Sequence, residues 1–351
     1  MKLSIDCRFL GKSGIGTFLE NILNELLCNH PENFYVLIMD NKQLWDKKYT
    51  NVTIVRTSIK PFTLKEFFSF PTHEINSCDA FFSPYINIPG GIKVPVFSTV
   101  HDVIFLDIPN LVSRFGLMIR KCFISRAIRL SKCVFTVSEF SKNRIQYYFG
   151  FQKPIHIIYN SIPVHIRDYQ IPESQNKEDC YIYVGNIKPH KGLLTLVKAF
   201  ELAQKEGLTS RLLLIGEANK FRTSEQELNE LLHRIKNVEF SGWVANDRLC
   251  QLIAKSKALV LPSIYEGFGI PPMEAMYLGT KAIVSDIPVL KEIYSDFPVS
   301  FFETGNELNL KKKLLTTNIQ IDRDSIRKKI DTKYNVTEAV NKLLSVAYQN
   351  N

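Results

Sequence analysis

The sequence has few residues that would cross-link the chain or loosen it. Its seven cysteines are scattered over 351 residues, and no two of them lie in a CxxC spacing. This pattern argues against a disulfide framework and against a structural zinc site. Glycine and proline supply only 16 residues each, which excludes a linker-rich or collagen-like chain.

Long hydrophobic runs are also missing. No stretch approaches the ~18 consecutive apolar residues that a membrane-spanning helix needs. The first residues include Asp6, Arg8 and Lys12, where a signal peptide would have its apolar core. With 45% hydrophobic and 23% charged residues, the composition is that of an ordinary globular protein. We therefore expect a cytoplasmic protein.

The chain carries more positive than negative charge, with 44 Lys and Arg against 35 Asp and Glu. The excess is unevenly distributed. Residues 1–165 hold 19 basic and 12 acidic side chains, a net charge of +7, whereas residues 166–351 hold 25 and 23, a net charge of +2. The asymmetry indicates an anionic partner for the first half, which could be a membrane, a nucleic acid or a phosphorylated substrate.

Short apolar runs alternate with segments of helical periodicity along the whole chain, and this pattern predicts parallel sheets covered by helices on both faces. The polar segment 166–179 interrupts the alternation, which then restarts. We therefore predict an α/β fold of two Rossmann-like, doubly wound units over residues 1–168 and 169–332, followed by a helix within 333–351. Ligands of such sheets bind beyond the carboxyl ends of the strands, so two facing units would hold a site in the cleft between them.

The segment 259–286 is the most informative. A predicted strand ends before Glu266, and the turn Gly267-Phe268-Gly269 leads through two prolines into a helix that contains Glu274. Proline is favoured in a first helical turn, and glycines beside it expose backbone N–H groups to an anion. The two carboxylates would accept hydrogen bonds from sugar hydroxyls. Alternatively, Glu274 only complements the helix dipole and Glu266 is solvated. Spacing alone does not decide between these interpretations.

This segment resembles a known family. The run EGFGIPPME resembles the paired-glutamate motif of retaining GT-B glycosyltransferases of family 4. Further stretches resemble that family in the same order along the chain: GIGTFLENIL, TVHDVIFLDIP, TVSEFSKNRI, YVGNIKPHKGLLTLVKAF, NVEFSGWVANDRLCQLIAKSKALVLPS and DIPVLKEI. The resemblance implies a GT-B fold in which the C-terminal helix returns to the first domain.

The resemblance also implies roles for single residues. Glu274 would bind the ribose of a nucleotide sugar, and Glu266 would bind hydroxyls of the transferred sugar. Lys191 would pair with the diphosphate. His101 would lie near the donor sugar, and Gly16 would let the first loop approach the phosphates. Without the resemblance, Lys191 reads as an exposed residue at a helix start. His101 then either caps a turn or belongs to the functional side chains that collect where parallel strands end.

Two loops would supply further donor contacts. Backbone amides would come from one loop and polar side chains from the other: Gly267, Phe268, Gly269 and Ile270 in the first, and Asn186, Lys188 and His190 in the second. Family members often have arginine where Asn186 or His190 stands, so Lys188 or His190 could replace the second phosphate cation. Thr17 also stands where arginine is common, which leaves the first loop less cationic.

Cleaving a sugar from a diphosphate leaves negative charge on the departing group, which the fixed charge of Lys191 and aligned amides would stabilise. Such a site can work without a metal ion, and we expect neither a metal nor another cofactor. The resemblance favours front-face attack, in which a donor phosphate oxygen takes the acceptor proton. Glu266 would then position the sugar and would not attack it.

Other motifs are weaker. Gly14-Ile15-Gly16 and the later Asp40 resemble a dinucleotide fingerprint, but Leu19 stands at the third glycine position. No GxxxxGK[ST] run occurs, which disfavours a P-loop nucleotide-binding protein. The triplet Asp322-Arg323-Asp324 matches a metal-binding DxD pattern, but no buried strand precedes it. It reads instead as the acidic start of a helix.

Two stretches of the basic half mix cations with aromatic and aliphatic residues. They are KPFTLKEFFSF at 60–70 and RFGLMIRKCFISRAIRLSK at 114–132. Such mixtures suit an anionic membrane surface. Alternatively, their aromatics belong to the core and their cations to a solvated face. Nucleic acid is a third option, but no recognised binding motif supports it.

The sequence thus predicts a retaining, metal-independent glycosyltransferase. It would move a sugar from a nucleotide sugar to a saccharide or lipid-linked saccharide in the synthesis of a bacterial surface polysaccharide such as O-antigen or capsule. The protein would be peripheral at the inner face of the plasma membrane. A nucleotide-sugar epimerase of GT-B architecture and a non-catalytic nucleotide-sugar binder are the alternatives. The nucleotide base, the sugar, the acceptor, the linkage and the oligomeric state stay open.

Overall fold

The computed structural model of this chain describes residues 1–11, 13–43, 49–150, 153–172, 176–216, 226–316 and 320–349. The chain divides into two compact units. The first comprises Met1–Ser161 and Tyr334–Asn351, and the second comprises Ile162–Lys333. Two places named in the sequence analysis lie outside the described residues: Lys12, and residues 173–175 of the polar segment.

The first unit is built on one parallel sheet with the strand order β3-β2-β1-β4-β5-β6-β7. Its strands are β1 (Lys2–Asp6), β2 (Phe34–Asp40), β3 (Val52–Thr57), β4 (Ala80–Ser83), β5 (Val96–Thr99), β6 (Ser131–Thr136) and β7 (Ile155–Ile157). Its helices are α1 (Ser13–Asn29), α2 (Lys65–Phe68), α3 (Thr72–Asn76), α4 (Ile104–Asp107), the 3-10 turn η1 (Pro109–Leu111), α5 (Arg114–Leu130), α6 (Glu139–Phe149) and α15 (Val336–Gln349).

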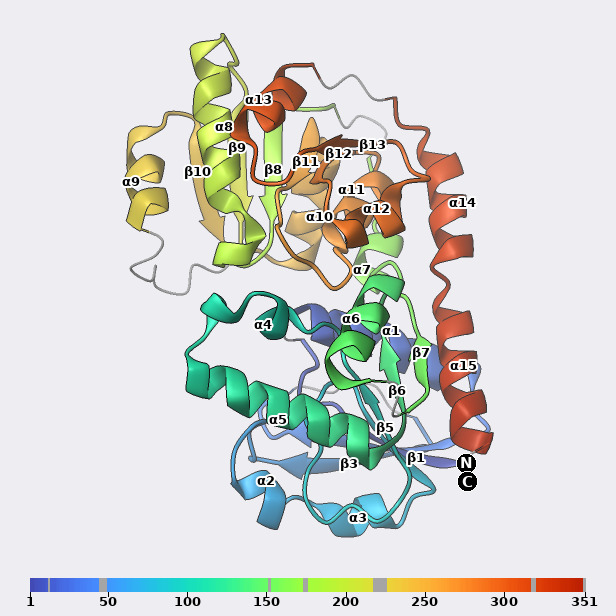
Figure 1. Cartoon of the computed structure of the whole chain (residues 1–351). Helices are drawn as coiled ribbons and strands as arrows, with labels where there is room; N and C mark the ends of the chain where they lie inside the picture. Colours follow the sequence, from blue (N-terminus) through green and yellow to red (C-terminus); the bar gives the residue numbers. More distant parts are fainter. Residues whose placement is uncertain are drawn as a thin grey trace. The chain divides into compact units, whose positions relative to one another are not determined.

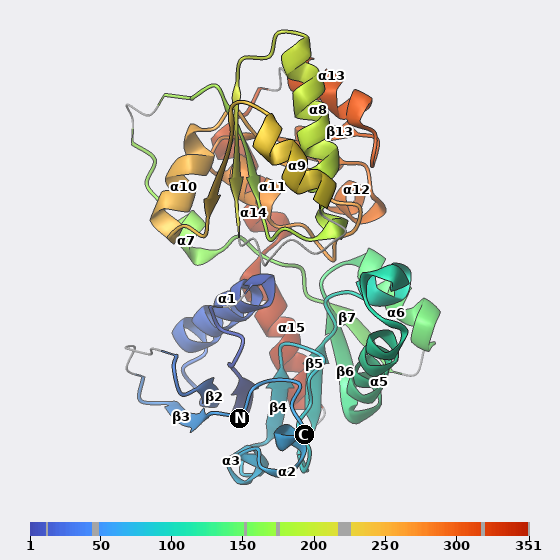
Figure 2. The same ribbon diagram turned by 90° about the vertical axis from the view of Figure 1, so that its left-hand side faces the viewer.

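Helices cover both faces of this sheet (Figure 2). The helix α1 packs against α15. The opposite face, which includes Val36 and Ile38 of β2, packs against Ile124 of α5 and Ile145 of α6. Because the central strands are buried on both faces, they are apolar runs without alternation, as parallel strands require.

The second unit repeats this plan with the strand order β10-β9-β8-β11-β12-β13, again all parallel (Figure 1). Its strands are β8 (Cys180–Val184), β9 (Arg211–Ile215), β10 (Val238–Gly242), β11 (Ala258–Leu261), β12 (Lys281–Ser285) and β13 (Val299–Phe302). Its helices are α7 (Val164–Arg167), the 3-10 turn η2 (Pro189–Lys191), α8 (Leu193–Lys205), α9 (Gln226–Arg234), α10 (Asn246–Lys255), α11 (Pro271–Tyr277), α12 (Pro288–Tyr294), α13 (Glu307–Thr316) and α14 (Arg323–Lys333).

The predicted fold class, two Rossmann-like units with parallel sheets, is confirmed. In each sheet the strand order reverses direction once, between β1 and β4 and between β8 and β11. The loops that leave such neighbouring strands part to opposite faces, so a ligand can reach the sheet edge at this point. These two switch points are therefore where functional side chains are expected.

The boundary between the units lies at Ser161, earlier than the predicted boundary at residue 168. The reason is α7, which packs against α10 and α11 of the second unit. The Cys250 thiol of α10 donates to the carbonyl of His165 in α7 at 3.5 Å. The polarity of the sequence from residue 166 onward does not reveal this packing.

The Ser138 hydroxyl caps α6 by accepting from the Ser141 amide at 3.0 Å. Two local predictions are confirmed. Two prolines occupy the first turn of α11. The triplet at 322–324 begins α14, where the Asp322 carboxylate accepts from the Ser325 amide at 3.2 Å. In the part of the chain that is described, no helix combines the length and the apolar character needed to cross a membrane.

Candidate functional site

Lys191 and Glu266 form an ion pair at the switch point of the second sheet. The Lys191 ammonium Nζ lies 2.7 Å from Glu266 Oε1 and 2.8 Å from Oε2. Lys191 ends the 3-10 turn η2 after β8, and Glu266 follows β11, the neighbouring strand. The pair thus joins the two loops that leave the sheet at the point where the strand order reverses.

A glycine makes this approach possible. Gly192 has a φ of +67°, and a Cβ built on it would lie 1.9 Å from the carbonyl oxygen of Pro262. The Ile264 amide also donates to the His190 carbonyl at 2.9 Å. Only a residue without a Cβ allows the β8 and β11 loops to come this close, and the left-handed backbone of Gly192 turns the chain into α8.

Ser263 holds the Glu266 carboxylate from the other side. Its hydroxyl donates to Glu266 Oε1 at 2.7 Å, and its own carbonyl accepts from the Ser285 hydroxyl. Both serines are fully buried. The Glu266 carboxylate is therefore oriented by one cation and one hydroxyl, a charge-assisted arrangement with little freedom.

The glycine-rich turn after Glu266 is anchored to α12. Gly269 has a φ of +85°, and its Cβ would lie 2.6 Å from Leu290 Cδ2. The Tyr294 hydroxyl donates to the Gly269 carbonyl. Phe268 is buried, whereas Gly267 and Ile270 are partly exposed. The turn is a fixed element, and the amides of residues 267–270 remain candidates for donor contacts.

Glu274 lies in the first turn of α11, two residues after Pro272, and it is buried although it carries a carboxyl group. Desolvation raises the pKa of Glu274 to about 7. A carboxyl group so placed gains from any ligand that donates hydrogen bonds to its charged form. Complementing the helix dipole, the alternative considered above, would not require this burial.

The three residues predicted to contact the donor phosphates from the loop after β8 differ in charge. Burial, and then Lys191, lower the pKa of His190 to about 4, so His190 is neutral near pH 7. In the unliganded chain, His190 can therefore supply a hydrogen bond but carries no positive charge. The sequence alone allows it as the second cation for the phosphates. Lys188 is exposed, and Asn186 contributes its backbone carbonyl to the Tyr183 hydroxyl at 3.1 Å.

In the first unit, His101 follows β5 and bonds to the loop after β4. Its Nε2 lies 2.8 Å from the Pro84 carbonyl oxygen, and its ring packs edge-on against Phe18 at 4.9 Å between centroids. Because a carbonyl only accepts, Nε2 must carry the proton. Burial lowers the pKa of His101 to about 4 despite this bond, so the ring is neutral and Nδ1 is an acceptor.

Asp102 and Gly16 have local structural tasks. The Asp102 carboxylate accepts from the Ile104 amide at 3.0 Å and caps α4. Gly16 lies within the first turn of α1, and its Cβ would be 2.6 Å from the Phe9 carbonyl oxygen. The backbone at Phe9 therefore lies so close to position 16 that a side chain there would collide with it.

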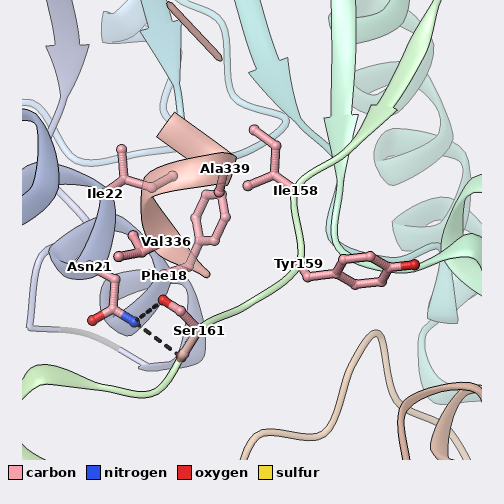
Figure 3. Close-up of a pocket in the computed structure, with 8 residues that line it drawn as sticks. All are labelled: Phe18, Asn21, Ile22, Ile158, Tyr159, Ser161, Val336 and Ala339. Carbon is pink, nitrogen blue, oxygen red and sulfur yellow. Dashed lines mark hydrogen bonds between the residues drawn. The ribbon is translucent and has the colours of Figure 1, made fainter. Parts of the chain in front are cut away.

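A small pocket lies elsewhere in the first unit, where the segment after β7 meets α1 and α15 (Figure 3). The Asn21 amide donates to the Ser161 carbonyl at 3.1 Å and to its hydroxyl at 2.9 Å. None of the predicted site residues lines this pocket. Among the described residues, no three His, Cys, Asp or Glu side chains gather as possible metal ligands.

Two family models match most of the chain. Residues 166–316 match the family model of Glycosyl transferases group 1, and residues 75–165 match that of Glycosyltransferase Family 4. The chain belongs to these group 1 and family 4 glycosyltransferases. Lys191, Glu266 and Glu274 lie in the first matched segment and His101 in the second.

Two solved structures show that the fold is shared with glycosyltransferases. WaaG, described as a glycosyltransferase involved in lipopolysaccharide biosynthesis, has a TM-score of 0.74 at 16% identity, over 99% of both chains. Anabaena HepE in complex with UDP-glucose has a TM-score of 0.72 at 16% identity, over 99% of this chain and 100% of that one. The fold is GT-B, as the resemblance implied.

A curated relative is similar in sequence over a shorter region. The O-antigen chain mannosyltransferase RfbU of Salmonella typhimurium strain LT2 is 31% identical over 199 residues, which are 56% of this chain and 54% of that protein. The chain spans about half the length of the curated relatives it matches first.

The structure reveals supporting residues to which the sequence gave no role. Ser263 orients Glu266, Tyr294 anchors the glycine turn, and the Pro84 carbonyl sets the His101 tautomer. Burial, and the nearby Glu266 carboxylate, raise the pKa of Tyr183, which packs under Gly185. A serine or tyrosine in an apolar strand end is too common a signal to have identified them.

Proposed function

We propose that this chain is a retaining, metal-independent glycosyltransferase. It transfers a sugar from a nucleotide-diphosphate sugar to a saccharide or lipid-linked saccharide, in the assembly of a bacterial surface polysaccharide. The observation that carries the proposal is the Lys191–Glu266 pair at the switch point of the second sheet, inside the segment that matches the glycosyltransferase family.

The pair provides both halves of a donor site. The ammonium of Lys191 suits a diphosphate oxygen, and the carboxylate of Glu266 suits the hydroxyls of the sugar next to it. When the donor binds, the phosphate competes for Lys191 and the sugar competes for Glu266. The positive charge of Lys191 then stabilises the diphosphate as the glycosidic bond breaks.

Glu274 suits the ribose of the nucleotide. Two adjacent hydroxyls donate to both oxygens of a carboxylate, and this favours the charged form of a group whose pKa is about 7 in the unliganded protein. His101 supplies an acceptor at Nδ1 for a sugar hydroxyl, since its Nε2 donates to Pro84. The amides of residues 267–270 supply further donors.

The proposed chemistry proceeds on one face of the sugar. The bond from the anomeric carbon to the diphosphate breaks, and a bond from that carbon to the acceptor oxygen forms on the same side. A phosphate oxygen of the departing diphosphate takes the acceptor proton. Glu266 is held by Lys191 and Ser263, which suits positioning of the sugar better than attack on it.

The similar proteins and the net charge of the first unit support the proposed acceptor and the proposed location in the cell. RfbU is described as an O-antigen chain mannosyltransferase, which favours a surface saccharide as acceptor. Lipid-linked saccharides lie at a membrane, and the net charge of +7 over residues 1–165 favours an anionic surface. We propose that the first unit faces the inner leaflet of the plasma membrane.

A thermal-shift panel of UDP-, GDP-, ADP- and dTDP-sugars, mannose included, identifies the donor, because a bound ligand stabilises the fold. Transfer is then measured with that donor and candidate acceptors. Glu266→Gln and Lys191→Ala should lose most of the transfer activity and keep the fold. Full activity in both variants would overturn the proposal. Conversion of the donor without an acceptor would identify an epimerase, and donor binding without any turnover would identify a binding protein.

A further inference from the structure

The two basic and aromatic stretches of the first unit pack against one another. Phe62 packs edge-on against Phe123 of α5, with 5.3 Å between the ring centroids. The Arg126 guanidinium of α5 lies 5.1 Å from the ring centre of Phe67 in α2. Residues 60–70 are therefore held against α5, although more than 40 residues of sequence separate the two stretches.

A buried ion cluster fixes the backbone of this segment. Arg8, which is fully buried after β1, pairs with Asp6 at 2.6 Å and with Glu66 of α2 at 2.7 Å. It also donates to the Ile59 carbonyl at 3.0 Å and lies 4.4 Å from the ring centre of Phe70. Both ends of the segment are thus tied to the sheet through one guanidinium.

Although its backbone is held, the segment exposes large apolar side chains. Leu64 is 79% exposed and Phe68 is 87% exposed, one helical turn apart. On α5, Phe115 is 67% exposed and Met118 is 55% exposed, and Ile119 and Cys122 continue the i, i+3, i+4, i+7 stripe. Exposed apolar side chains gathered in this way are unusual on a protein that contacts only water.

Cations surround these apolar side chains. The helix α5 contains five basic residues and no acidic one (Arg114, Arg120, Lys121, Arg126 and Arg129). Lys60 and Lys65 are exposed on the neighbouring segment, whereas the acidic Glu66 is buried in the ion cluster. The surface therefore combines an apolar stripe with uncompensated positive charge.

We propose that this surface, made by residues 60–70 and α5, inserts into the headgroup region of an anionic lipid bilayer. Its apolar side chains would enter the acyl boundary, and its cations would bind lipid phosphates. No recognised nucleic-acid-binding motif occurs in either stretch, and two copies of the positively charged α5 would repel one another. The inference rests on the proposed function, because it supplies the membrane side of a lipid-linked acceptor.

Vesicle sedimentation tests the surface with the full chain and without any donor or acceptor. The protein should bind vesicles of phosphatidylglycerol and phosphatidylethanolamine and should not bind phosphatidylcholine alone. The Phe68→Ser and Phe115→Ser changes should each weaken binding about tenfold, the usual cost of removing a buried phenylalanine from an apolar phase. Phe34→Ser, at an exposed phenylalanine that begins β2, is the matched control and should bind like the wild type.

A probe on Cys122 measures insertion directly. Cys122 and Cys28 are the exposed cysteines. In a Cys28→Ser background, a fluorescent label on Cys122 should be quenched by nitroxide-bearing lipids. A label on Cys28 in a Cys122→Ser background, on α1, should not be. Equal quenching at both positions, or binding that resists the phenylalanine changes, would overturn the proposal. So would self-association through this surface or nucleic-acid binding without vesicle binding.

The experiment is independent of catalysis. Insertion without sugar transfer would leave the inference intact and remove the proposed function. Transfer to a water-soluble acceptor without vesicle binding would support the proposed function and overturn the inference about the membrane. The Phe68→Ser variant should keep its thermal midpoint, because its side chain is exposed, and it should keep transfer to a soluble acceptor.

Discussion

The ammonium of Lys191 bridges both carboxylate oxygens of Glu266, at 2.7 Å and 2.8 Å, across 75 residues of sequence. The residue proposed to bind the diphosphate is thus neutralised by the residue proposed to bind the sugar. Each charge is largely shielded from water, so neither is left unpaired in the unliganded protein. A donor that carries both a phosphate and a hydroxyl replaces the two partners at once.

Lys191→Ala should reduce kcat/KM for sugar transfer about 100- to 1,000-fold, since it removes the charge that stabilises the departing diphosphate. The change leaves Glu266 without its cation and should lower the free energy of unfolding by about 1–3 kcal/mol. Steady-state kinetics and urea unfolding measure the two effects. Lys188→Ala, at an exposed lysine of the same loop, is the control and should have the smaller effect on both. Equal losses in the two variants would contradict the assignment.

Glu274→Gln should change how stability depends on pH. The folded pKa of about 7 lies above the ordinary value of 4.5 for a glutamate, so the carboxyl group favours folding while it is protonated. Wild-type stability should therefore fall relative to Glu274→Gln as the pH rises from about 4.5 to about 7, by about 3 kcal/mol, and level off above that. Urea unfolding of both proteins at several pH values tests this. A constant difference across the range would show that Glu274 has no raised pKa.

Gly192→Ala should impair transfer more than its effect on stability explains. The added Cβ would collide with the Pro262 carbonyl, and the left-handed backbone would be strained by about 1–3 kcal/mol. Both effects displace the loop that carries Lys191. Gly207→Ala also meets a positive φ, but nothing lies within 4 Å of its Cβ, so it should lose stability and keep activity. Comparable kcat/KM in the two variants would refute the positional role of Gly192.

His101 should stay neutral throughout the working range. Because its pKa is about 4, the NMR signals of the His101 ring should not titrate between pH 6 and 8. His101→Ala should weaken donor binding about tenfold through the loss of one hydrogen bond. A midpoint near pH 6.5 for His101 would mean that the ring is solvated. The proposed acceptor at Nδ1 would then have to be abandoned.

The sequence by itself determined the features that depend on near neighbours. Apolar runs of four to seven residues alternating with helical periodicity predicted two parallel sheets, and the prolines before Glu274 predicted the start of α11. Such patterns are local, because a strand or a helix is selected by side chains a few residues apart. The motif around Glu266 likewise pointed to the family that the comparisons then identified.

Only the tertiary structure decided which distant groups contact each other and which buried groups are charged. The β8–β11 pairing brings Lys191 to Glu266, and Arg8 ties residues 60–70 to the sheet. Burial lowers the pKa of His190 to about 4 in the unliganded chain, and the packing of α7 moves the unit boundary to Ser161. Desolvation and pairing depend on every element packed around a group, and the strand order that brings those elements together is not encoded in any single segment.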